Sequence, residues 1–465
     1  MPPFTVEDVV RGTRGALIAG DLGVPVGGVS IDSRTLDIGD AFFAIRGPHH
    51  DGHLFVGDAA ARGASCLVVQ ALSDDLPASV PAVLVDDTTR ALGRLAAYHR
   101  ARFTGPVAAV TGSNGKTTTK EMMAAVLGQL GPVLKPESSF NNQWGLPLTL
   151  LKLGPQHRAV ALELGANTPG EIAALAEIGR PTIGVVTVVS SAHTEFFGSL
   201  DGVQAEKSAL VRAIPVHGAV VLNADDPRVI AMRGLSHARV LTFSRRGPAD
   251  VKAVGSVDER AEGIRFGLEV RGERRPVSLQ FAGRHNVVNA LAAAGVGVAL
   301  GLDLELIAAG LETARPVKGR CVWKRTRGIG LRILDDTYNA NPTSVLAALE
   351  TLAAADDARR RVVVLADMLE LGAIAAAAHR DAGRAVAASG AAEFVGVGPL
   401  ARLAVEAARE AGLAESHHVS TFEDTVALLL KRLGPGDALL VKGSRGMRME
   451  RVVDALMAHF GGADG

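Results

Sequence analysis

Hydrophobic residues in the middle of the chain come in short unbroken runs rather than in alternation with polar ones. Four such runs lie at 106–110, 159–164, 182–189 and 219–223. Continuous apolar runs are typical of parallel strands that are buried on both faces of a sheet. Helical patterns separate several of these runs, the clearest at 116–130. This alternation predicts a doubly wound parallel sheet with right-handed crossovers.

The regions on either side of this segment have α/β patterns of their own. The first mixes short apolar runs with glycine-rich turns and ends in a helix-like stretch at 88–102. The last repeats strand, turn and helix from about Pro316 onward. Before it, residues 250–280 alternate as short strands do, and a long helix is predicted at 286–300. The 465 residues, at roughly 150 per domain, fit three domains, which we place at 1–103, 104–314 and 315–465.

Charge and cysteine content narrow the classes of function. Lysine plus arginine and aspartate plus glutamate each number 49, so the chain has no formal net charge. A dedicated nucleic-acid binder needs a basic face to neutralise phosphates, and this balance argues against one. Cys66 and Cys321 lie too far apart in sequence for a disulfide framework or a thiolate metal site. We expect two packed thiols in a reducing compartment.

No segment has the pattern of a signal peptide or a membrane span. The N-terminus lacks a basic start followed by an apolar core. No run of about 18 consecutive apolar residues occurs, and the longest candidate, 290–300, is typical of a buried helix. We therefore expect a cytoplasmic protein without membrane insertion, and we expect it to be a monomer.

The strongest local signal is a glycine-rich loop between a predicted strand and a predicted helix. Residues 110–119 read Val-Thr-Gly-Ser-Asn-Gly-Lys-Thr-Thr-Thr. Glycines let backbone N–H groups approach phosphate oxygens, the lysine can reach the β- and γ-phosphates, and Thr117 offers a hydroxyl to Mg²⁺. Val110 stands where the usual pattern has glycine, and a turn that binds nothing is the alternative. The context favours a bound nucleotide phosphate, with contacts predicted from Gly112, Ser113, Asn114, Gly115, Lys116, Thr117 and Thr118.

Four further blocks extend this signal into a family resemblance. They are Phe-Asn-Asn at 140–142 followed by Gly-Leu-Pro-Leu-Thr-Leu at 145–150, Asp-Asp-Thr-Tyr-Asn-Ala-Asn-Pro at 335–342, Asp-Met-Leu-Glu-Leu-Gly at 367–372, and Lys-Gly-Ser-Arg-Gly-Met-Arg-Met-Glu at 442–450. With them the chain resembles the ATP-dependent Mur ligases of peptidoglycan synthesis over essentially its whole length. Within that family the blocks look like those of the members that add D-alanyl-D-alanine.

The resemblance implies an architecture and a reaction. The three domains would be an N-terminal domain for the UDP-sugar, a central P-loop domain for ATP, and a C-terminal Rossmann-like domain for the incoming dipeptide. The substrates would be UDP-N-acetylmuramoyl-tripeptide and D-alanyl-D-alanine. ATP would phosphorylate the peptide carboxylate to an acyl phosphate, which the amine of the dipeptide then attacks. Lys116 and two Mg²⁺ ions would offset the charge where the two anions meet.

The resemblance also implies metal ligands, each with a plainer alternative. Glu163 ends a predicted strand, where a carboxylate points into the ligand crevice of a parallel sheet or is simply solvated. His193 follows another strand end, although a lone histidine is more often structural. Lys207 would be carbamylated, which turns a cation into an oxygen ligand, whereas periodicity alone indicates a surface lysine. Together with the catalytic Lys116, the predicted catalytic and metal residues are Thr117, Glu163, His193 and Lys207.

Two further groups of site residues follow from the same resemblance. The ATP site would add His285, Asn286, Asn289, Arg320, Asp336 and Asn339. The alternative for Asn286 is a helix cap, and that for nearby Asn341 is a turn before proline. The substrates would be bound by Ser33, Arg34, Arg46, Asn141, Asn142, Asp367, Lys442, Ser444 and Arg445. In the last group an acid would hold the dipeptide's ammonium and a base its carboxylate, the alternative being surface salt bridges.

Two other functions stay open at this level. One is a related ligase of the same superfamily, which adds a single amino acid or adds glutamate to folate. The Phe140 block and the Lys442 block speak against it. The other is a nucleotide-binding module without catalysis, against which the combination of Lys116, Thr117 and Glu163 argues.

Overall fold

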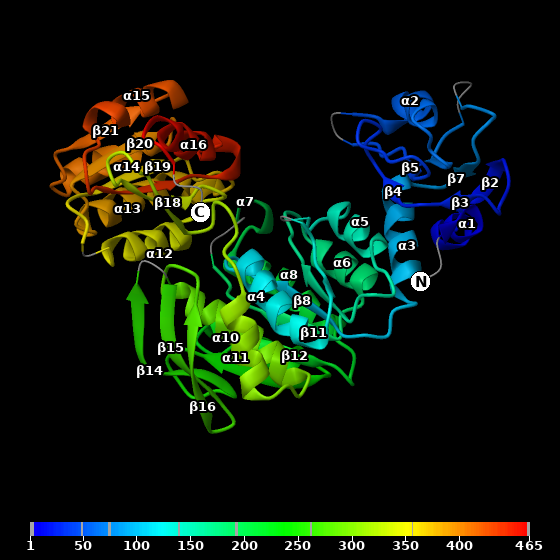
Figure 1. The fold of residues 1–465 in the computed structure, drawn as a ribbon, viewed down its shortest axis with the longest axis horizontal. Coiled ribbons are helices and arrows are strands. Elements are labelled where there is room, and N and C mark those ends of the chain that lie inside the picture. Colours follow the sequence, from blue (N-terminus) through cyan, green and yellow to red (C-terminus); the bar gives the residue numbers. More distant parts are fainter. Residues whose placement is uncertain are drawn as a thin grey trace.

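A computed structural model describes residues 4–47, 50–72, 76–137, 140–190, 194–260, 263–355 and 357–462 of the chain. Three large β-sheets, each with its own helices, form three bodies that follow one another along the chain (Figure 1), and a further two-stranded sheet belongs to the first body. The α/β class with three domains, as predicted from the sequence, is confirmed. In the described parts of the chain, no helix combines the length and the apolar character that crossing a bilayer requires.

The N-terminal body is a small α/β unit built on a five-stranded sheet of order β2-β7-β6-β5-β4. A short antiparallel pair, β1 with β3, lies beside it. Its elements are β1 (Phe4–Thr5), α1 (Val6–Thr13), β2 (Ala16–Ala19), β3 (Pro25–Val26), β4 (Val29–Ser30), β5 (Ala41–Phe43), α2 (Val56–Ala61), β6 (Cys66–Val69), β7 (Ala82–Leu84) and α3 (Thr88–Arg100).

The central body is built on a nine-stranded sheet of order β16-β15-β14-β13-β12-β11-β8-β10-β9, parallel except where β15 pairs with its two neighbours. Its strands are β8 (Val107–Thr111), β9 (Val133–Leu134), β10 (Ala159–Glu163), β11 (Ile183–Val186), β12 (Ala219–Asn223), β13 (Arg239–Ser244), β14 (Val251–Arg260), β15 (Gly263–Val270) and β16 (Glu273–Leu279). Its helices are α4 (Lys116–Leu127), α5 (Gly145–Leu151), α6 (Glu171–Gly179), α7 (Thr194–Phe197), α8 (Leu200–Ala213), α9 (Pro227–Ile230), α10 (His285–Ala299) and α11 (Leu304–Thr313).

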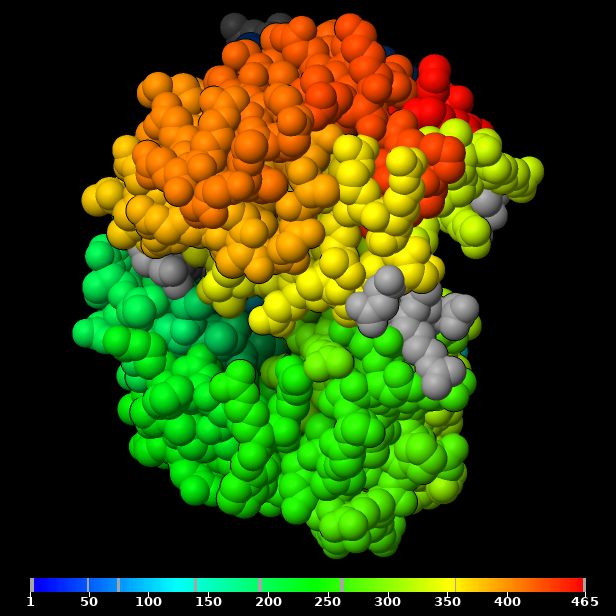
Figure 2. Space-filling model, turned by 90° about the vertical axis from the view of Figure 1, so that its left-hand side faces the viewer, coloured from blue at the N-terminus to red at the C-terminus, as the bar shows by residue number. Residues whose placement is uncertain are grey.

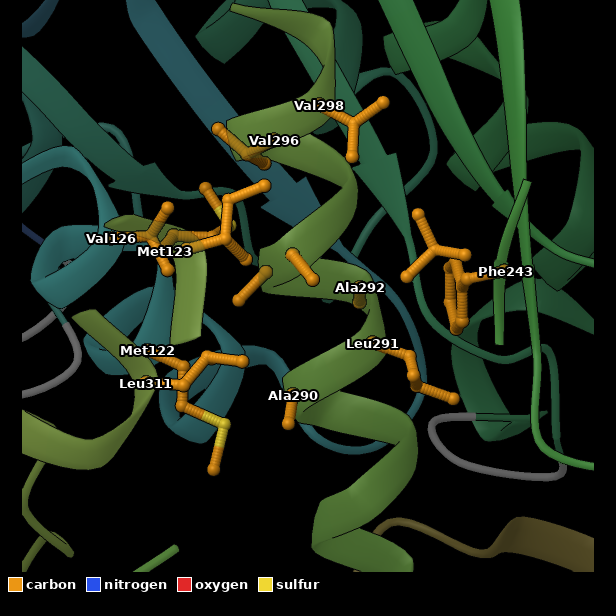
Figure 3. Close-up of a cluster of buried hydrophobic side chains, with 14 of the residues drawn as sticks. Met122, Met123, Val126, Phe243, Ala290, Leu291, Ala292, Val296, Val298 and Leu311 are labelled. Carbon is orange, nitrogen blue, oxygen red and sulfur yellow. The ribbon is translucent and has the colours of Figure 1, made fainter. Parts of the chain in front are cut away.

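The unbroken apolar runs are buried strands, as their pattern predicts. Every residue of β8, β10, β11 and β12 is buried. Helices α4, α10 and α11 pack on one face of the sheet, where Met122, Met123 and Leu291 belong to one cluster (Figure 3). Burying such side chains is worth roughly 1.5–3 kcal/mol each, so this core fixes α4 and α10 rigidly against the strands.

One predicted strand is shorter than its apolar run. Residues 182–189 were expected to form a single strand, but β11 ends at Val186. The following residues leave the sheet because they bind the glycine-rich loop: Thr187 Oγ1 donates to Asn114 O at 2.6 Å, and Val188 O accepts from Ser113 N at 2.8 Å. The last residues of the apolar run therefore hold the glycine-rich loop in place and do not extend the strand.

The C-terminal body is a six-stranded sheet of order β17-β18-β22-β19-β20-β21, in which the edge strand β17 is antiparallel and the others are parallel. Its strands are β17 (Val322–Arg325), β18 (Arg332–Asp336), β19 (Arg361–Ala366), β20 (Glu393–Val397), β21 (Ser416–Val419) and β22 (Ala438–Lys442). Its helices are α12 (Pro342–Ala353), α13 (Ala375–Ala388), α14 (Ala401–Glu410), α15 (Phe422–Arg432) and α16 (Glu450–His459). The C-terminal body lies directly against the central one along a seam (Figure 2).

Both cysteines are buried free thiols, as expected. Burial raises the pKa of the Cys66 thiol to about 12, and it raises the pKa of the Cys321 thiol as well. Raised thiol pKa values keep both groups protonated and unreactive at neutral pH.

Candidate active site

A cavity of about 1020 Å³ lies between the central and C-terminal bodies. It is lined by the glycine-rich loop, the end of β10, one face of α8, the start of α10 and the strand ends of the C-terminal sheet. Most of the predicted ATP, metal and dipeptide residues line it together, although they are up to about 330 positions apart in sequence: Ser113 to Thr118, Asn141, Asn142, Glu163, Lys207, His285, Asn286, Asn289, Arg320, Asp336, Asn339, Lys442, Ser444 and Arg445.

The loop after β8 has a backbone that only glycine can form at two positions. Gly112 and Gly115 have φ values of +153° and +81°. A Cβ at Gly112 would lie 1.9 Å from Thr187 Oγ1, and one at Gly115 would lie 2.3 Å from Asn289 Oδ1. The loop thus needs glycine both for its conformation and for its close neighbours. The loop leads directly into the N-terminus of α4. The backbone N–H groups of a helix N-terminus form an anion-binding site.

Lys116 is the first residue of α4 and curls back over the loop. Its Nζ donates to Gly112 O at 2.8 Å. Burial lowers the pKa of this ammonium group, the carboxylate of Glu163 opposes the shift, and Arg320 reinforces it. Two cationic side chains therefore face the same space beside one carboxylate, which is an arrangement suited to a polyanionic ligand.

Glu163 offers an oxygen to a cation. It is the last residue of β10 and is 1% exposed. Its Oε1 accepts from Asn141 Nδ2 at 2.7 Å. Its Oε2 is buried without a hydrogen-bond partner among the residues that the structure describes. An unpaired buried carboxylate oxygen that lines the same cavity as the Thr117 hydroxyl fits a hard divalent cation such as Mg²⁺.

Lys207 is buried rather than on the surface, so the plainer expectation from helix periodicity is wrong. It lies on α8 at 3% exposure and lines the cavity. Burial and the neighbouring Lys116 lower its pKa to about 7, against the opposing effect of Glu206. Glu206 in turn accepts from the backbone N–H groups of Gly170 and Ile172, both at 2.7 Å, and so joins α8 to the start of α6. His193, the third predicted metal ligand, lies outside the described residues.

The start of α10 supports the loop from the other side. Asn286 donates to Ala282 O at 2.7 Å and accepts from Asn289 Nδ2 at 2.7 Å, so its side chain does not cap the helix. Asn289 Oδ1 accepts from Thr119 Oγ1 at 3.2 Å. Burial lowers the pKa of the neighbouring His285 to about 4, so its imidazole is neutral at pH 7.

The C-terminal body reaches the loop through two side chains. Arg320 Nη2 donates to Thr117 Oγ1 at 3.0 Å, and the guanidinium lies 4.0 Å from the ring centroid of Tyr338. Asn341 Nδ2 donates to Asn114 Oδ1 at 2.7 Å, and Asn114 Nδ2 donates back at 3.3 Å. Sequence reasoning did not assign these contacts to Asn341 or Tyr338. The Asn-Pro sequence at 341–342 is typical of a helix start, and Asn341 is the N-cap of α12. That sequence does not indicate a contact with the glycine-rich loop.

At the carboxyl edge of the C-terminal sheet the charged residues are paired with one another. Lys442 forms a hydrogen-bonded ion pair with Asp336 and donates to Asn339 O at 2.9 Å. The other oxygen of Asp336 accepts from Cys321 N at 3.1 Å. Ser444 Oγ accepts from Leu369 N at 2.8 Å. These groups line the cavity, but their polar atoms are already engaged.

Asp367 is buried and does not line the cavity. Its Oδ1 accepts from Ala401 N at 2.7 Å, at the start of α14. A Cβ at Gly398 would come within 2.8 Å of the carboxylate, so the protein encloses this acid closely. The structure therefore does not bring Asp367 together with Lys442 and Arg445 in one open site. Its predicted contact with the dipeptide stays a prediction.

The residues predicted for the UDP-sugar, Ser33, Arg34 and Arg46, belong to the N-terminal body and are not among the residues that line this cavity. Ser33 is buried, and the exposed Arg34 forms two hydrogen bonds with Asp32, at 2.9 and 2.7 Å. Arg46 donates to Asp51 at 2.9 Å, and Asp51 also contacts His53. The predicted role of Ser33, Arg34 and Arg46 in binding the UDP-sugar stays a prediction.

Three family models match the chain in succession. The Mur ligase family catalytic domain matches residues 25–100, the Mur ligase middle domain 110–297, and the Mur ligase glutamate ligase domain 319–445. Curated relatives cover nearly the whole chain. The UDP-N-acetylmuramoyl-tripeptide–D-alanyl-D-alanine ligase of Mycobacterium tuberculosis is 38% identical over 93% of this chain and 92% of its own length. The chain belongs to the Mur ligase family.

Other Mur ligases agree in sequence and in fold. The UDP-N-acetylmuramoyl-tripeptide–D-alanyl-D-alanine ligase of Escherichia coli is 37% identical over 92% of this chain and 93% of its own. A crystal structure of MurF from Acinetobacter baumannii has a TM-score of 0.90 at 33% identity and covers 98% of this chain and 99% of its own. MurF from Thermotoga maritima, solved in complex with ADP, has a TM-score of 0.82 at 26% identity, over 93% and 97%. ATP is accordingly the nucleotide of this Mur ligase.

Proposed function

We propose that this Mur ligase joins D-alanyl-D-alanine to UDP-N-acetylmuramoyl-tripeptide with cleavage of ATP to ADP and inorganic phosphate. The observation that carries the proposal is the cavity at the seam, where a phosphate-binding loop from one domain meets the charged strand ends of another. Ligation needs such a junction, because a nucleotide, a carboxylate and an amine have to be held within reach of each other. The curated relatives, which carry this activity in their names, favour these substrates over a single amino acid or folate.

The first chemical step brings two anions together. The γ-phosphoryl group of ATP passes to the terminal carboxylate of the peptide, a P–O bond to the β-phosphate breaks, and an acyl phosphate forms. Lys116 and Arg320 face the loop from the two domains and would stabilise the charge on the transferred group. The dipeptide amine then attacks the acyl carbon, and inorganic phosphate leaves as the amide bond forms.

Two magnesium ions are part of this proposal. Thr117 and Glu163 would hold one of them and Lys207 and His193 the other. The unpaired Oε2 of Glu163 supports the first assignment. When bound, Mg²⁺ would supply positive charge that offsets the negative charge of the phosphates during transfer. Arg320 Nη2 donates to the Thr117 hydroxyl oxygen, so the C-terminal domain contacts the proposed ligand of the first ion directly.

Carbamylation of Lys207 also belongs to the proposal. A carbamate forms when a neutral amine adds to CO₂ with loss of one proton, which converts a repelling ammonium into an oxygen ligand. The lowered pKa of Lys207, about 7, makes the neutral amine accessible near physiological pH. The positive charge of the neighbouring Lys116 would stabilise the resulting carbamate anion.

The outer domains complete the assignment. Residues 1–103 would bind the UDP-sugar through Ser33, Arg34 and Arg46. Residues 315–465 would bind the dipeptide through Asp367, Lys442, Ser444 and Arg445. Asn141 and Asn142 line the central cavity, and the resemblance assigns both to the substrates.

A phosphate-release assay tests the function. The purified protein is supplied with ATP, Mg²⁺, UDP-N-acetylmuramoyl-tripeptide and either D-alanyl-D-alanine or single amino acids, and the ligated product is identified by mass. We expect phosphate release and product with the dipeptide. Release with a single amino acid alone would indicate the related ligase, and nucleotide binding without turnover would indicate a non-catalytic module.

A further inference from the structure

Two neighbouring asparagines in one loop have different partners in the structure. Asn142 Oδ1 accepts from the backbone N–H groups of Trp144 and Gly145, at 3.2 and 2.9 Å, and so starts α5. Asn141 reaches β10 instead, where its Nδ2 donates to Glu163 Oε1 at 2.7 Å. One side chain therefore shapes the loop, while the other acts on a carboxylate of the candidate metal site.

The contact between Asn141 and Glu163 is built into the backbone. Gly165 N donates to Asn141 O at 3.0 Å, which fixes the loop beside the end of β10. A Cβ at Gly165 would lie 2.8 Å from Cγ, Nδ2 and Oδ1 of Asn141. Gly165 does not have a positive φ, so the position requires glycine for the space that Asn141 fills and not for its conformation.

This contact uses one oxygen of Glu163 and leaves the other. The carboxylate is 1% exposed, and Oε2 has no hydrogen-bond partner within the described ranges. A carboxylate held by one oxygen cannot turn freely, so the direction of its second oxygen is set before any ligand arrives. Hydrogen bonds of this kind, from outside the ligand set, orient metal-binding carboxylates in many proteins.

We propose that Asn141 is a positioning residue that holds Glu163 so that its free oxygen is presented to the divalent cation. The inference rests on the proposed function and deepens it at one residue. It differs from the expectation that the family resemblance gave, in which Asn141 contacts the substrate. Asn141 in this view touches neither nucleotide nor peptide, and its effect passes through Glu163.

Metal binding by the protein itself tests the inference. Mn²⁺ is titrated into the nucleotide-free protein, and free Mn²⁺ is followed by its EPR signal. We expect Asn141→Ala to weaken Mn²⁺ binding about 10- to 100-fold, the usual effect of losing such a supporting hydrogen bond. Gly165→Ala should weaken it as well, because its methyl group displaces the Asn141 side chain. Gly128→Ala is the matched control, since a Cβ at Gly128 meets nothing within 4 Å.

The double variant makes the test specific. In Asn141→Ala the atoms that Gly165→Ala would strike are absent, so Asn141→Ala with Gly165→Ala should bind Mn²⁺ as Asn141→Ala does. Additive losses in the double variant would overturn the proposal. So would unchanged Mn²⁺ affinity in Asn141→Ala with a raised KM for UDP-N-acetylmuramoyl-tripeptide, because that pattern indicates a substrate contact.

Misfolding and a failure of ligation are each distinguished from loss of the metal site. The thermal midpoint of each variant is measured, and if Asn141→Ala fails to fold, Gly165→Ala alone decides, since it removes no polar group. Unchanged Mn²⁺ binding in that variant would contradict the proposal. The titration needs neither ATP nor peptide, so a protein that fails to ligate D-alanyl-D-alanine but loses Mn²⁺ binding on Asn141→Ala would refute the proposed function and leave this inference standing.

Discussion

The two sheet edges that face the cavity differ in how their charged groups are satisfied. At the central sheet, Glu163 keeps an unpaired oxygen and the ammonium of Lys116 rests on a backbone carbonyl. At the C-terminal sheet, Lys442 and Asp336 neutralise each other, and Asp367 is turned into the start of α14. The central edge is prepared for a charged ligand, whereas the C-terminal edge has to exchange existing contacts to bind one.

This difference shows what a position at a strand end does and does not determine. The carboxyl ends of parallel strands place side chains at a ligand crevice in both sheets. Whether a side chain is available there depends on its neighbours in space. Charged side chains that pair with each other at a sheet edge stabilise the protein without ligand. Charged side chains without such a pair at the edge are available to bind a ligand.

The largest change in the free energy of unfolding should come from breaking the ion pair between Lys442 and Asp336 at the edge of the C-terminal sheet. Lys442→Met leaves the Asp336 carboxylate without its cation, and we expect the free energy of unfolding to fall by about 3–5 kcal/mol. Urea denaturation followed by Trp323 fluorescence, in a Trp144→Phe background, reports on this body because β17 pairs with β18. Asp336→Asn combined with Lys442→Met should recover part of the loss. Equal stability of Lys442→Met and the parent would show that the pair contributes nothing.

Substitution at the edge of the central sheet should lower turnover rather than the free energy of unfolding. Lys116→Ala removes a cation from the site of phosphoryl transfer, and we expect turnover to fall about a hundredfold, or ~3 kcal/mol of transition-state stabilisation. The free energy of unfolding should change much less than in Lys442→Met, because the Lys116 ammonium donates to a backbone carbonyl and is not bonded to a carboxylate. Steady-state kinetics and urea denaturation measure the two quantities. Lys152→Ala, at an exposed lysine, is the control, and similar turnover in both variants would refute the role of Lys116.

The smallest effect should appear in the pH dependence of stability at His285, where the two edges meet. Its pKa of about 4 in the folded protein lies below the ordinary value of 6.5, and Asp336 and Lys442 influence it in opposite directions. Between these pH values the unfolded chain binds a proton that the folded protein does not, so this group's contribution to stability is lost as pH falls from 6.5 towards 4.

His285→Gln removes that proton uptake. We expect the loss of unfolding free energy between pH 7 and pH 4.5 to be smaller in the variant than in the parent by roughly 2 kcal/mol. Urea denaturation at a series of pH values gives the comparison. Parallel pH profiles for the two proteins would show that His285 titrates normally in the fold.

The fold could be predicted from sequence because its signals are local. Continuous apolar runs are enough to identify β8, β10 and β12, and the Gly-Lys-Thr sequence places a phosphate loop before α4. The exception is β11, which ends at Val186 because Thr187 and the residues after it bind the loop. Such a strand end depends on a tertiary contact, which hydrophobic periodicity does not contain.

The contacts of the site residues could be predicted less well than their location. Most of the site residues that the resemblance predicts line one cavity in the structure. For Asn141 the resemblance predicts a substrate contact, and the structure shows a hydrogen bond from its side chain to Glu163. The resemblance also predicts that Asp367 binds the dipeptide, a contact that stays a prediction, while the structure shows that Asp367 Oδ1 accepts from Ala401 N. In both cases the hydrogen-bond partner seen in the structure lies far away in the sequence. A sequence motif gives the residue type at a position but not its partner in space.

The reciprocal amide pair between Asn114 and Asn341 joins segments 227 positions apart. Each of these asparagines is also held within its own domain, since Asn114 O accepts from Thr187 Oγ1 and Asn341 Oδ1 accepts from Ser344 N. A chimaeric enzyme that takes its last domain from a distant homologue would therefore disturb the nucleotide loop unless both partners were transplanted together. The unit that evolution or an engineer can exchange is larger here than a single domain.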